Sequence, residues 1–397
     1  MFVNNQQAQA ILESLRKGIP PEGFVRTFTV GRKHEIDDLK KRLDKDDGTV
    51  LLVKANYGSG KTHLLKFIKE EALEKNYAVS LVTIDSNSGV RFNRMDQIMG
   101  AVCRNIQINS EKNEKGLAPL FNLFATNFKN DKLTNSYFNK ISNYGKWDYS
   151  EILDSKAMFI ALRAWTTGLQ SAQDTIIDWF YNPSNYRESR KHLYQSLVLE
   201  LRSYFHDPRP EWKFYDDNVF VTNKNGYEQS WAVLRDINTL CKQSGLRGFI
   251  ILFDEFEDVI TNLNNVRYQE GAFWNLFHFY EGKMFQGKTF FAVTPDFVNK
   301  CKRKLHIKER WDFDYARFDK LPMYEMSPLQ LLELEELSLL IFDVHSIAYE
   351  WEPDTIMLDS YFKSVIKKAA EVPVQDRVRN VIIRVVEELD NLYQELH

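Results

Sequence analysis

The sequence predicts an α/β protein built on a parallel β-sheet, with a large helical insertion and an all-helical C-terminal lid. Short continuous runs of β-branched and aromatic residues alternate with helical patterns, which is typical of strands buried on both faces of a parallel sheet. Residues 109–228 and residues 326–397 show helical periodicity instead. The 397 residues, 44% of them hydrophobic, are enough to bury a substantial core.

The N-terminal segment is expected to be a short helix followed by a linker. Residues 6–17 have amphipathic periodicity, and Gly18 with the prolines after it ends the helix. Residues 1–22 are therefore assigned to an N-terminal helix and linker. In the stretch VGRKHEIDDLKKRLDK, Gly31 and Arg32 precede a second helix whose apolar residues share one face.

Five apolar runs predict the strands of the sheet. The runs TVLLVKA and NYAVSLVTID, with a helical pattern between them, form a βαβ unit. After the insertion the α/β pattern returns with RGFIILFDE, GKTFFAVTP and FDKLPMYEM. Residues 23–325 are therefore predicted to form one α/β domain, interrupted at about 109–228. Residues 327–330 look like a capping-box start, and residues 326–397 are predicted to be an all-helical lid.

Composition and charge exclude several classes of protein. The formal net charge is −3 and the pI about 6.3, so contacts with nucleic acid or anionic lipid would need a local cationic patch. The three cysteines have no metal-ligand spacing, which argues against a zinc site and against a disulfide framework. The sequence shows neither a signal-peptide pattern nor an apolar stretch of membrane-spanning length. A cytoplasmic protein without membrane contact is therefore expected.

Residues 55–62, ANYGSGKT, predict a phosphate-binding loop. They fit G-x-x-x-x-G-K-[ST] at every defined position except the first, where alanine replaces glycine. In such a loop, backbone N–H groups surround the phosphates, the next helix adds its positive N-terminus, Lys61 neutralises phosphate charge and Thr62 places its hydroxyl on Mg²⁺. The alternative is a structural turn, but the position between a buried strand and a helix favours nucleotide binding. The candidate ATP contacts are Asn56, Tyr57, Gly58, Ser59, Gly60, Lys61, Thr62 and His63.

Ala55 in the loop and His63 directly after it each have an alternative interpretation. Ala55 would be strained if its backbone needed a positive φ, which glycine adopts freely. His63 follows the loop directly, and packing against the sheet is the alternative to a nucleotide contact.

A phosphate-binding loop implies an acidic residue at the end of another buried strand, and FIILFDEFED supplies a pair. Asp254 would hold Mg²⁺, and the candidate catalytic residue Glu255 would polarise the water that attacks the γ-phosphate. The alternative is an ordinary acidic loop after a core strand. Glu257 and Asp258 are expected on a solvated face.

Further polar residues are candidates for the catalytic step. Thr294 ends a strand expected between the two strands just described, where it could hydrogen-bond the attacking water or the γ-phosphate; capping of the next turn is the alternative. Arg317 or Arg310 could reach the γ-phosphate of a neighbouring subunit. Arg379 or Arg377 could reach the nucleotide from the lid of the same chain. A surface ion pair is the alternative for each arginine.

Taken together, VGRKHEIDDL, NYGSGKTHLL, FIILFDEFE, FFAVTP and RVRNVIIRVVEELD resemble AAA+ P-loop ATPases of the origin-recognition and initiator-like (ORC/Cdc6-like) branch. More closely, they look like the BrxD-like ATP-binding proteins of bacterial BREX phage-defence systems. The stretches ILESLRKGIPPEGF, RFNRMDQIMGAVCRNI, DTIIDWF and LRDINTLCKQSGLRGFIILFDEFE support the narrower resemblance. It covers the core and the lid and is weak between residues 109 and 170. The sequence departs from the family pattern at Ala55 and at Thr294, where glycine and asparagine are more usual.

The resemblance implies ATP and Mg²⁺ as cofactors and ATP hydrolysis as the reaction. It implies that Gly31 and Arg32 lie near the adenine and that Arg379 is the lid arginine. It also implies nucleotide-dependent assembly into a homo-oligomer, and action with DNA and with other defence-system proteins.

Two other function classes remain possible on the sequence alone. One is a nucleotide-operated switch or scaffold with little turnover, and the other is an AAA+ DNA-binding regulator of the transposition or initiator type. The run NKCKRKLHIKER, residues 299–310, carries six positive charges that could contact DNA phosphates or an acidic neighbouring subunit. The aromatic residues of the insertion are expected in the core rather than as surfaces for base stacking. These are Trp147, Tyr149, Trp165, Trp179 and Phe180.

Overall fold

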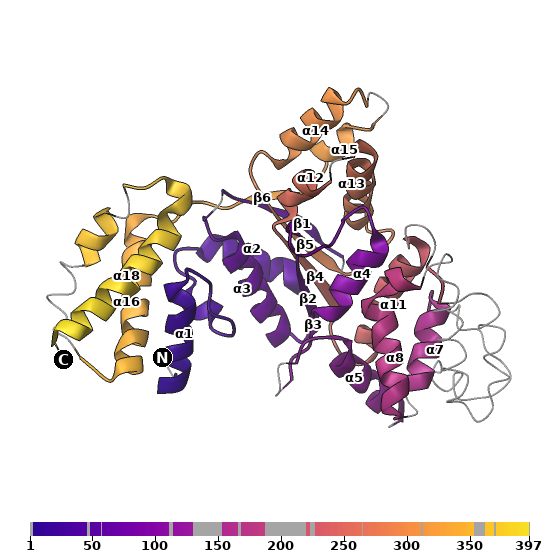
Figure 1. Cartoon of the computed structure of the whole chain (residues 1–397), viewed down its shortest axis with the longest axis horizontal. Helices are drawn as coiled ribbons and strands as arrows, with labels where there is room; N and C mark the ends of the chain where they lie inside the picture. The colour runs from indigo at the N-terminus through magenta and orange to yellow at the C-terminus, as the bar shows by residue number, and fades with distance from the viewer. Residues whose placement is uncertain are drawn as a thin grey trace.

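The structure is a computed structural model, and Figure 1 shows a central sheet with helices on both sides. It describes residues 3–45, 48–56, 58–110, 114–129, 153–165, 168–186, 220–222, 227–263, 265–310, 313–352, 362–368 and 371–396.

Within these residues the sheet has six strands. The strands are β1 (Val50–Lys54), β2 (Ala78–Thr83), β3 (Ile106–Gln107), β4 (Phe249–Asp254), β5 (Lys288–Val293) and β6 (Met323–Glu325). They lie in the order β3-β2-β4-β5-β1-β6, in which β2 and β3 are antiparallel and all other neighbours are parallel. The predicted α/β class with a parallel sheet is confirmed, and the antiparallel edge strand β3 is an addition that the sequence did not indicate.

The strand order brings three polar strand ends together. β5 lies between β1 and β4, and all three strands run in the same direction. The phosphate-binding loop after β1, Asp254 at the end of β4 and Thr294 just after β5 therefore lie at one edge of the sheet. In open parallel sheets this carboxyl edge is where ligands bind.

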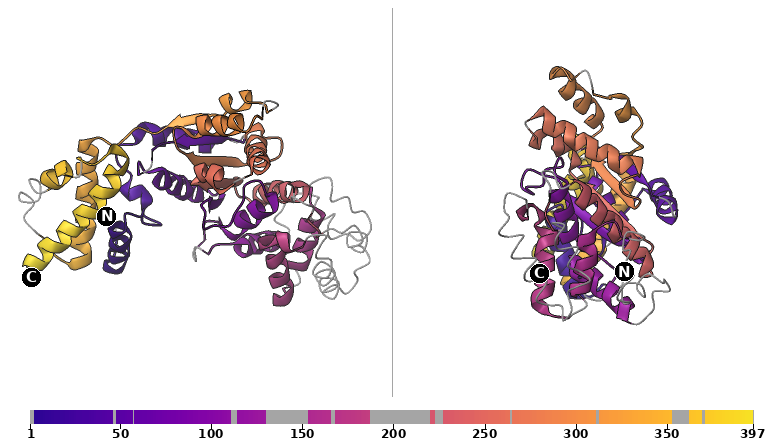
Figure 2. Two further views of the ribbon diagram at one scale, coloured as in Figure 1. Left: turned by 45° about the horizontal axis from the view of Figure 1, so that its top comes forward. Right: turned by 90° about the vertical axis from the view of Figure 1, so that its right-hand side faces the viewer.

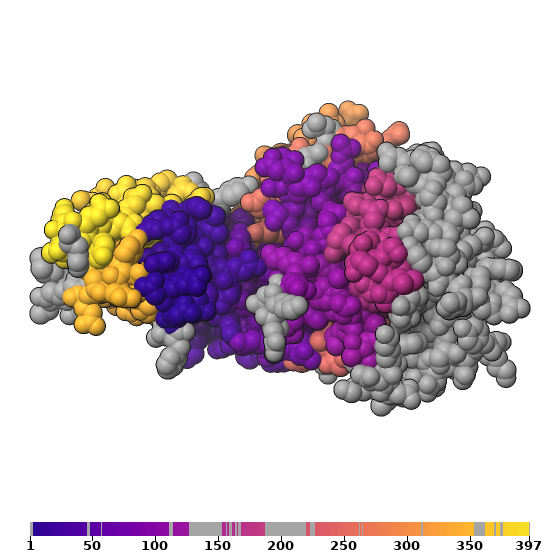
Figure 3. Space-filling model, turned by 60° about the horizontal axis from the view of Figure 1, so that its bottom comes forward, coloured from indigo at the N-terminus to yellow at the C-terminus, as the bar shows by residue number. Residues whose placement is uncertain are grey.

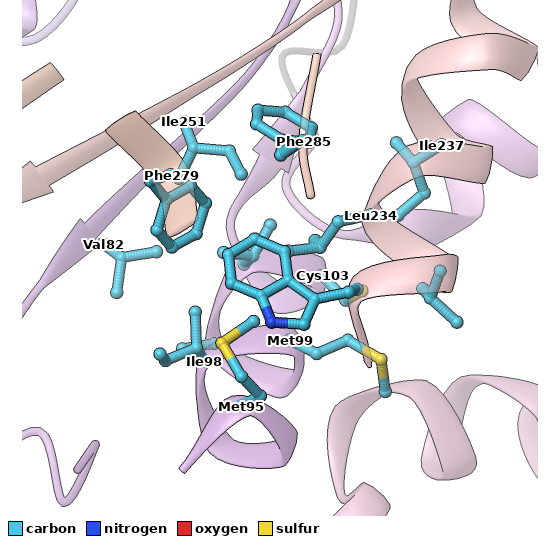
Figure 4. Packing of buried hydrophobic residues seen from close by; sticks show 14 of the residues in the cluster. Val82, Met95, Ile98, Met99, Cys103, Leu234, Ile237, Ile251, Phe279 and Phe285 are labelled. Atoms are coloured by element: carbon cyan, nitrogen blue, oxygen red, sulfur yellow. The ribbon is translucent and has the colours of Figure 1, made fainter. Parts of the chain in front are cut away.

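Helices cover both faces of the sheet because its central strands are apolar on both sides. β4 and β5 are buried along their whole length. The helices α2 (Lys33–Asp44) and α3 (Lys61–Glu74) pack on one face, and α4 (Met95–Arg104), α11 (Tyr227–Gln243) and α13 (Val266–Glu281) pack on the other. Figure 4 shows the second face, where side chains of α4 and α11 belong to one apolar cluster. The labelled ones are Met95, Ile98, Met99 and Cys103 of α4 and Leu234 and Ile237 of α11.

The described part of the insertion is helical. It comprises α5 (Leu117–Lys129), α7 (Lys156–Trp165), α8 (Gln170–Tyr181) and the short 3-10 turn η3 (Pro183–Asn185). Trp165, Trp179 and Phe180 are buried, and Trp179 Nε1 donates to the Phe220 carbonyl at 2.9 Å, so the expectation that these aromatics form core is confirmed. Trp147 and Tyr149 lie outside the described residues.

Short helices follow β4 and β5 at the top of Figure 1. After β4 come the 3-10 turn η5 (Phe256–Asp258) and α12 (Val259–Asn262). After β5 come α14 (Phe297–Ile307) and α15 (Ala316–Asp319).

The two ends of the chain meet in a separate helical group. It consists of α1 (Asn5–Arg16), α16 (Leu331–Tyr349) and α18 (Val374–Leu396), which we call the terminal helix group. The short 3-10 turn η1 (Val25–Phe28) connects α1 to the core. Figures 2 and 3 show this group at the opposite end of the molecule from the insertion, with α1 (indigo) lying against the orange and yellow helices.

An apolar core and a polar network hold the terminal helix group together. Ile11, Leu12 and Leu15 of α1 are buried against apolar residues of α16 and α18. Arg16 Nη2 pairs with Asp390 Oδ1 at 2.8 Å, which ties α1 to α18. α1 is therefore anchored to the C-terminal helices. No helix in the described ranges is both long and apolar enough to cross a bilayer.

Candidate nucleotide-binding site

A cavity of about 260 Å³ lies between the phosphate-binding loop, the end of β4 and the terminal helix group. Its polar end is lined by Asn56, Gly58, Ser59, Gly60, Lys61, Thr62, His63, Asp254, Glu255 and Glu257. Its apolar part is lined by Leu15, Ile19, Pro20, Pro21, Phe28, Val30, Leu329, Leu337, Val378 and Ile382. The cavity thus combines a charged end with a hydrophobic end, as a site for a ligand with one polar and one apolar part requires.

The backbone of the loop is shaped by its glycines. Gly58 has φ +69° and Gly60 has φ +93°, a left-handed conformation that residues with a Cβ rarely adopt. Gly60 directly precedes α3, so the loop leads into the positive end of a helix of 14 residues. Ala55 is not among the residues with positive φ, so alanine at this position is unstrained. Tyr57 lies outside the described residues.

Lys61 is buried and engaged. Its Nζ donates to the Ala55 carbonyl at 3.0 Å and lies 3.1 Å from Glu257 Oε1. Glu257 is only 7% exposed, so the prediction that it lies on a solvated face is wrong, whereas Asp258 is half-buried. Burial raises the pKa of Glu257, and the Lys61 ammonium opposes this rise.

Thr62 and Asp254 lie next to each other. The Thr62 hydroxyl hydrogen-bonds the Asp254 carboxylate, which opposes the rise that burial causes in the pKa of Asp254. The backbone N–H of Glu255 also donates to Asp254 Oδ1 at 3.0 Å. A hydroxyl and a carboxylate are therefore held together beside the loop.

This donor set fits Mg²⁺. Both Thr62 and Asp254 offer oxygen ligands, which Mg²⁺ prefers. In the part of the chain that the structure describes, no group of three or more His, Cys, Asp or Glu side chains could hold a metal ion by itself.

Glu255 has an unusual backbone beside the cavity. Its φ is +53°, a left-handed conformation that costs a non-glycine residue about 1–2 kcal/mol. Burial and then the neighbouring carboxylates, Asp254 first and Asp85 next, raise its pKa. Backbone strain and a raised pKa, at the edge of a cavity, are common properties of catalytic residues.

Phe256 fixes this segment. It is fully buried, and its ring centre lies 4.6 Å from that of Phe92 and 4.7 Å from that of Phe291. The aromatic cluster therefore holds the turn that carries Glu255 and Glu257 on either side of Phe256.

Arg32 joins the loop to the segment that leads into α16. Its side chain is 5% exposed, Nη2 donates to the Ser59 carbonyl at 2.9 Å and Nη1 donates to the Ser327 carbonyl at 3.0 Å. Next to it, His63 Nε2 and Thr29 Oγ1 are 2.8 Å apart, and burial together with Arg32 lowers the pKa of His63 to about 4. Arg32 and His63 both line the cavity, at the phosphate-binding loop.

Gly31 lies beside the start of α16 and is not among the residues that line the cavity. Its φ is +62°, and a Cβ placed on it would lie 2.1 Å from Glu333 Cδ. Gly31 thus allows the close approach of α16 to the core.

Arg379 is the α18 arginine at the cavity. It is exposed, lines the cavity beside Gly18, and its Nη2 donates to the Lys17 carbonyl at 3.3 Å. Arg377 does not line the cavity.

Thr294 and the candidate arginines for a neighbouring subunit lie outside the cavity lining. Thr294 is buried, and its Oγ1 has no hydrogen-bond partner within the described residues. Arg317 pairs with Glu281 at 3.4 Å and its guanidinium lies 4.5 Å from the centre of the Trp274 ring, while Arg310 pairs with Glu270. Within one chain these two arginines are therefore held by local partners.

The basic run lies on α14 and the turn after it. Lys302 pairs with Asp319 at 2.5 Å, and Arg310 is paired as described above. The other cations of the run are exposed and follow one another at helical spacing. They are Lys300, Arg303, Lys304 and Lys308.

Comparison with known families agrees with this geometry. Residues 3–151 match the family described as BREX system ATP-binding protein BrxC/D. The predicted resemblance to BREX ATP-binding proteins is confirmed. The matched segment includes the phosphate-binding loop and ends before Asp254, and it supports an ATP-binding role in BREX defence. No curated protein and no solved structure matches the chain. The resemblance to the initiator-like branch stays a prediction.

Two parts of the site were missed from the sequence. Glu257 was not expected beside Lys61, although its position three residues after Asp254 was a possible signal. The apolar end of the cavity, formed in part by Leu15 and by the linker from Ile19 to Pro21, was not expected either. Only the packing of α1 on the C-terminal helices brings these residues to the cavity.

Proposed function

We propose that this chain binds ATP with Mg²⁺ and hydrolyses it to ADP and phosphate in a BREX defence system. The observation that carries the proposal is the cavity itself, because it joins the phosphate-binding loop and the Thr62–Asp254 pair to an apolar pocket. The polar end suits a triphosphate, and the apolar end suits the adenine ring.

Each residue of the polar end has a proposed task. The amides around Gly58 and Gly60 bind phosphate oxygens, and Lys61 neutralises the β- and γ-phosphates. Thr62 and Asp254 hold Mg²⁺, which supplies positive charge that offsets the charge developing on the phosphates. Glu255 orients the attacking water and accepts its proton.

Arginines complete the proposed site. Arg32 positions the loop through the Ser59 carbonyl, and Arg379 reaches the nucleotide from α18. The Thr294 hydroxyl, which has no hydrogen-bond partner among the described residues, is available to bind the attacking water or a phosphate oxygen. Arg317 acts on the nucleotide of a neighbouring copy, so the proposed active form is a homo-oligomer.

The test is nucleotide binding and turnover by three proteins. Wild-type protein should bind Mg-ATP in calorimetry and release phosphate. Lys61→Ala should weaken binding about ten- to hundred-fold, because hydrogen bonds to charged groups contribute about 1.5–3 kcal/mol. Glu255→Gln should bind ATP but lose turnover, since the amide cannot accept the proton. Equal turnover in all three folded proteins would contradict these roles.

DNA is the proposed partner of the exposed cations on α14. Lys300, Arg303 and Lys304 lie on one side of the helix, where each could neutralise one phosphate. Replacing all three by glutamine should lower the slope of DNA affinity against salt concentration by about 2–3, since each phosphate contact contributes about 0.9. An unchanged slope would exclude α14 as the contact. Recording ATP turnover with and without DNA distinguishes two kinds of protein. A DNA-stimulated ATPase should turn over faster with DNA, whereas a nucleotide-operated switch should change its oligomeric mass with ATP and show no response of turnover to DNA.

A further inference from the structure

The proposed ATP reaction does not account for the buried ion pair between Lys61 and Glu257. The Lys61 and Glu257 side chains are 8% and 6% exposed, and their charged atoms are 3.1 Å apart. Charges this deeply buried are stable only when they are paired, because each has lost its water. The ammonium that should neutralise phosphate is therefore already neutralised by a carboxylate of the same chain.

Glu257 is attached to a turn that cannot easily move away. Phe256, the residue before it, is fully buried in the aromatic cluster with Phe92 and Phe291. Displacing this turn would pull a large ring out of a packed core. The Glu257 carboxylate thus stays beside the loop when a phosphate arrives, and Lys61 is the partner with the flexible side chain.

We propose that Glu257 is a competing counter-ion that holds Lys61 when no nucleotide is bound and yields it to the β- and γ-phosphates. This inference rests on the proposed ATP site. When Lys61 turns to the phosphates, the Glu257 carboxylate loses its partner and faces further negative charge. Glu257 therefore lowers the affinity for ATP and ADP, and it should not affect AMP, which has no β- or γ-phosphate for Lys61 to bind.

The experiment compares Glu257→Gln with the wild-type protein and with a matched control, Asp258→Asn. Asp258 is the adjacent acid of the same turn and is half-buried. Calorimetry with ATP, ADP and AMP, each measured with and without Mg²⁺, should show about ten-fold tighter binding of ATP and ADP by Glu257→Gln, which corresponds to about 1.4 kcal/mol. AMP affinity should stay within about two-fold. Asp258→Asn should bind all three nucleotides as the wild type does.

Several outcomes would overturn the inference. Unchanged or weaker ATP binding by Glu257→Gln would do so, and weakening seen only with Mg²⁺ would identify Glu257 as a metal ligand instead. A gain that extends equally to AMP would point to a general structural effect. If Glu257→Gln does not fold, Glu257→Asp is the second variant. It shortens the side chain and so lengthens the distance to Lys61, which should give a smaller gain for ATP and ADP; no gain would again contradict the inference. A wild-type protein that binds no nucleotide would refute the proposed function as well, whereas wild-type binding without a gain in the variants refutes the counter-ion alone.

Discussion

Replacing Gly31 by alanine should loosen the contact between the core and α16. The φ of Gly31 is +62°, and the added Cβ would lie 2.1 Å from Glu333 Cδ and 2.2 Å from Glu333 Oε1. Glu333 cannot move freely, because its Oε2 accepts a hydrogen bond from the Gln330 N–H at 2.6 Å and caps the N-terminus of α16. The substitution therefore combines backbone strain with the loss of a helix cap.

The free energy of unfolding should fall by about 0.5–3.5 kcal/mol. The left-handed backbone costs alanine about 1–2 kcal/mol, and loss of the cap costs about 0.5–2 kcal/mol. The reduced entropy of the unfolded chain returns about 0.4–1 kcal/mol. Gly89 is a matched control, since its φ is +66° and an added Cβ would meet no atom of the described residues within 4 Å. Gly89→Ala should therefore cost only about 0–1.5 kcal/mol.

Urea unfolding followed by circular dichroism measures both variants. In a Glu333→Ala background the clash is absent, so Gly31→Ala should then cost as little as Gly89→Ala. If Gly31→Ala and Gly89→Ala lower the free energy of unfolding equally with Glu333 present, the Glu333 side chain can move aside without loss of stability. The reasoning about the close approach of α16 is then refuted.

Three further predictions concern the cluster under the site and the terminal helix group. Phe256→Ala should lower the free energy of unfolding by about 3–5 kcal/mol, as for other large core residues. It should also lower ATP turnover, because the turn that carries Glu255 would no longer be held in place. Phe256→Leu should cost much less stability, and an equal loss in both variants would argue against tight packing of the ring. Burial lowers the pKa of His345, and Trp351 donates to its Nδ1 at 2.9 Å, so the folded protein favours neutral His345. The stability that neutral His345 contributes should thus be complete above the unfolded-state pKa of about 6.5 and be lost as the pH falls below it. Between pH 8 and pH 5 the melting temperature should fall less in Trp351→Phe than in the wild type. An equal fall in both proteins would exclude the Trp351–His345 pair as the cause. Arg16→Met should destabilise the protein by about 1–3 kcal/mol, because the ion pair with Asp390 is half-buried. It should also weaken ATP binding, because α1 carries Leu15 of the cavity lining. An unchanged melting temperature and ATP affinity would show that this pair is not needed for stability or for ATP binding.

The phosphate-binding loop and the acid pair were predictable because the residues of each motif are adjacent in the sequence. Two glycines with positive φ, a lysine and a threonine must be adjacent to surround a phosphate, and the strand before them is recognisable from its apolar run. The acid pair follows another such run. The position of β5 between the two strands was also predicted, and the sheet order confirms it.

The burial of Glu257 was not predictable in the same way. Glu257 follows Phe256 in the acidic stretch FDEFED and is therefore expected to be exposed to solvent. Only the packing of the Phe256 ring and the position of Lys61 place the Glu257 carboxylate in the interior. β3 has two residues, too few for a periodic pattern, and its pairing with β2 depends on distant parts of the chain. The boundaries drawn at residues 22 and 325 stay predictions.

The amphipathic character of α1 was predictable, but the surface that it covers was not. Its apolar residues match a helix with one buried side, and nothing in residues 6–17 shows that this side packs on helices more than 300 residues later. Non-local contacts of this kind are decided by the whole fold.

The position of α1 also affects how the protein matures on the ribosome. α1 is synthesised more than 300 residues before α16 and α18, so Ile11, Leu12 and Leu15 cannot be covered by these helices until that length of chain has been made. Until then the apolar face of α1 stays exposed on the nascent chain, where chaperones or non-native partners can bind it. The cavity can acquire its hydrophobic wall only after α16 and α18 have been made and have packed on α1, so nucleotide binding should follow that step.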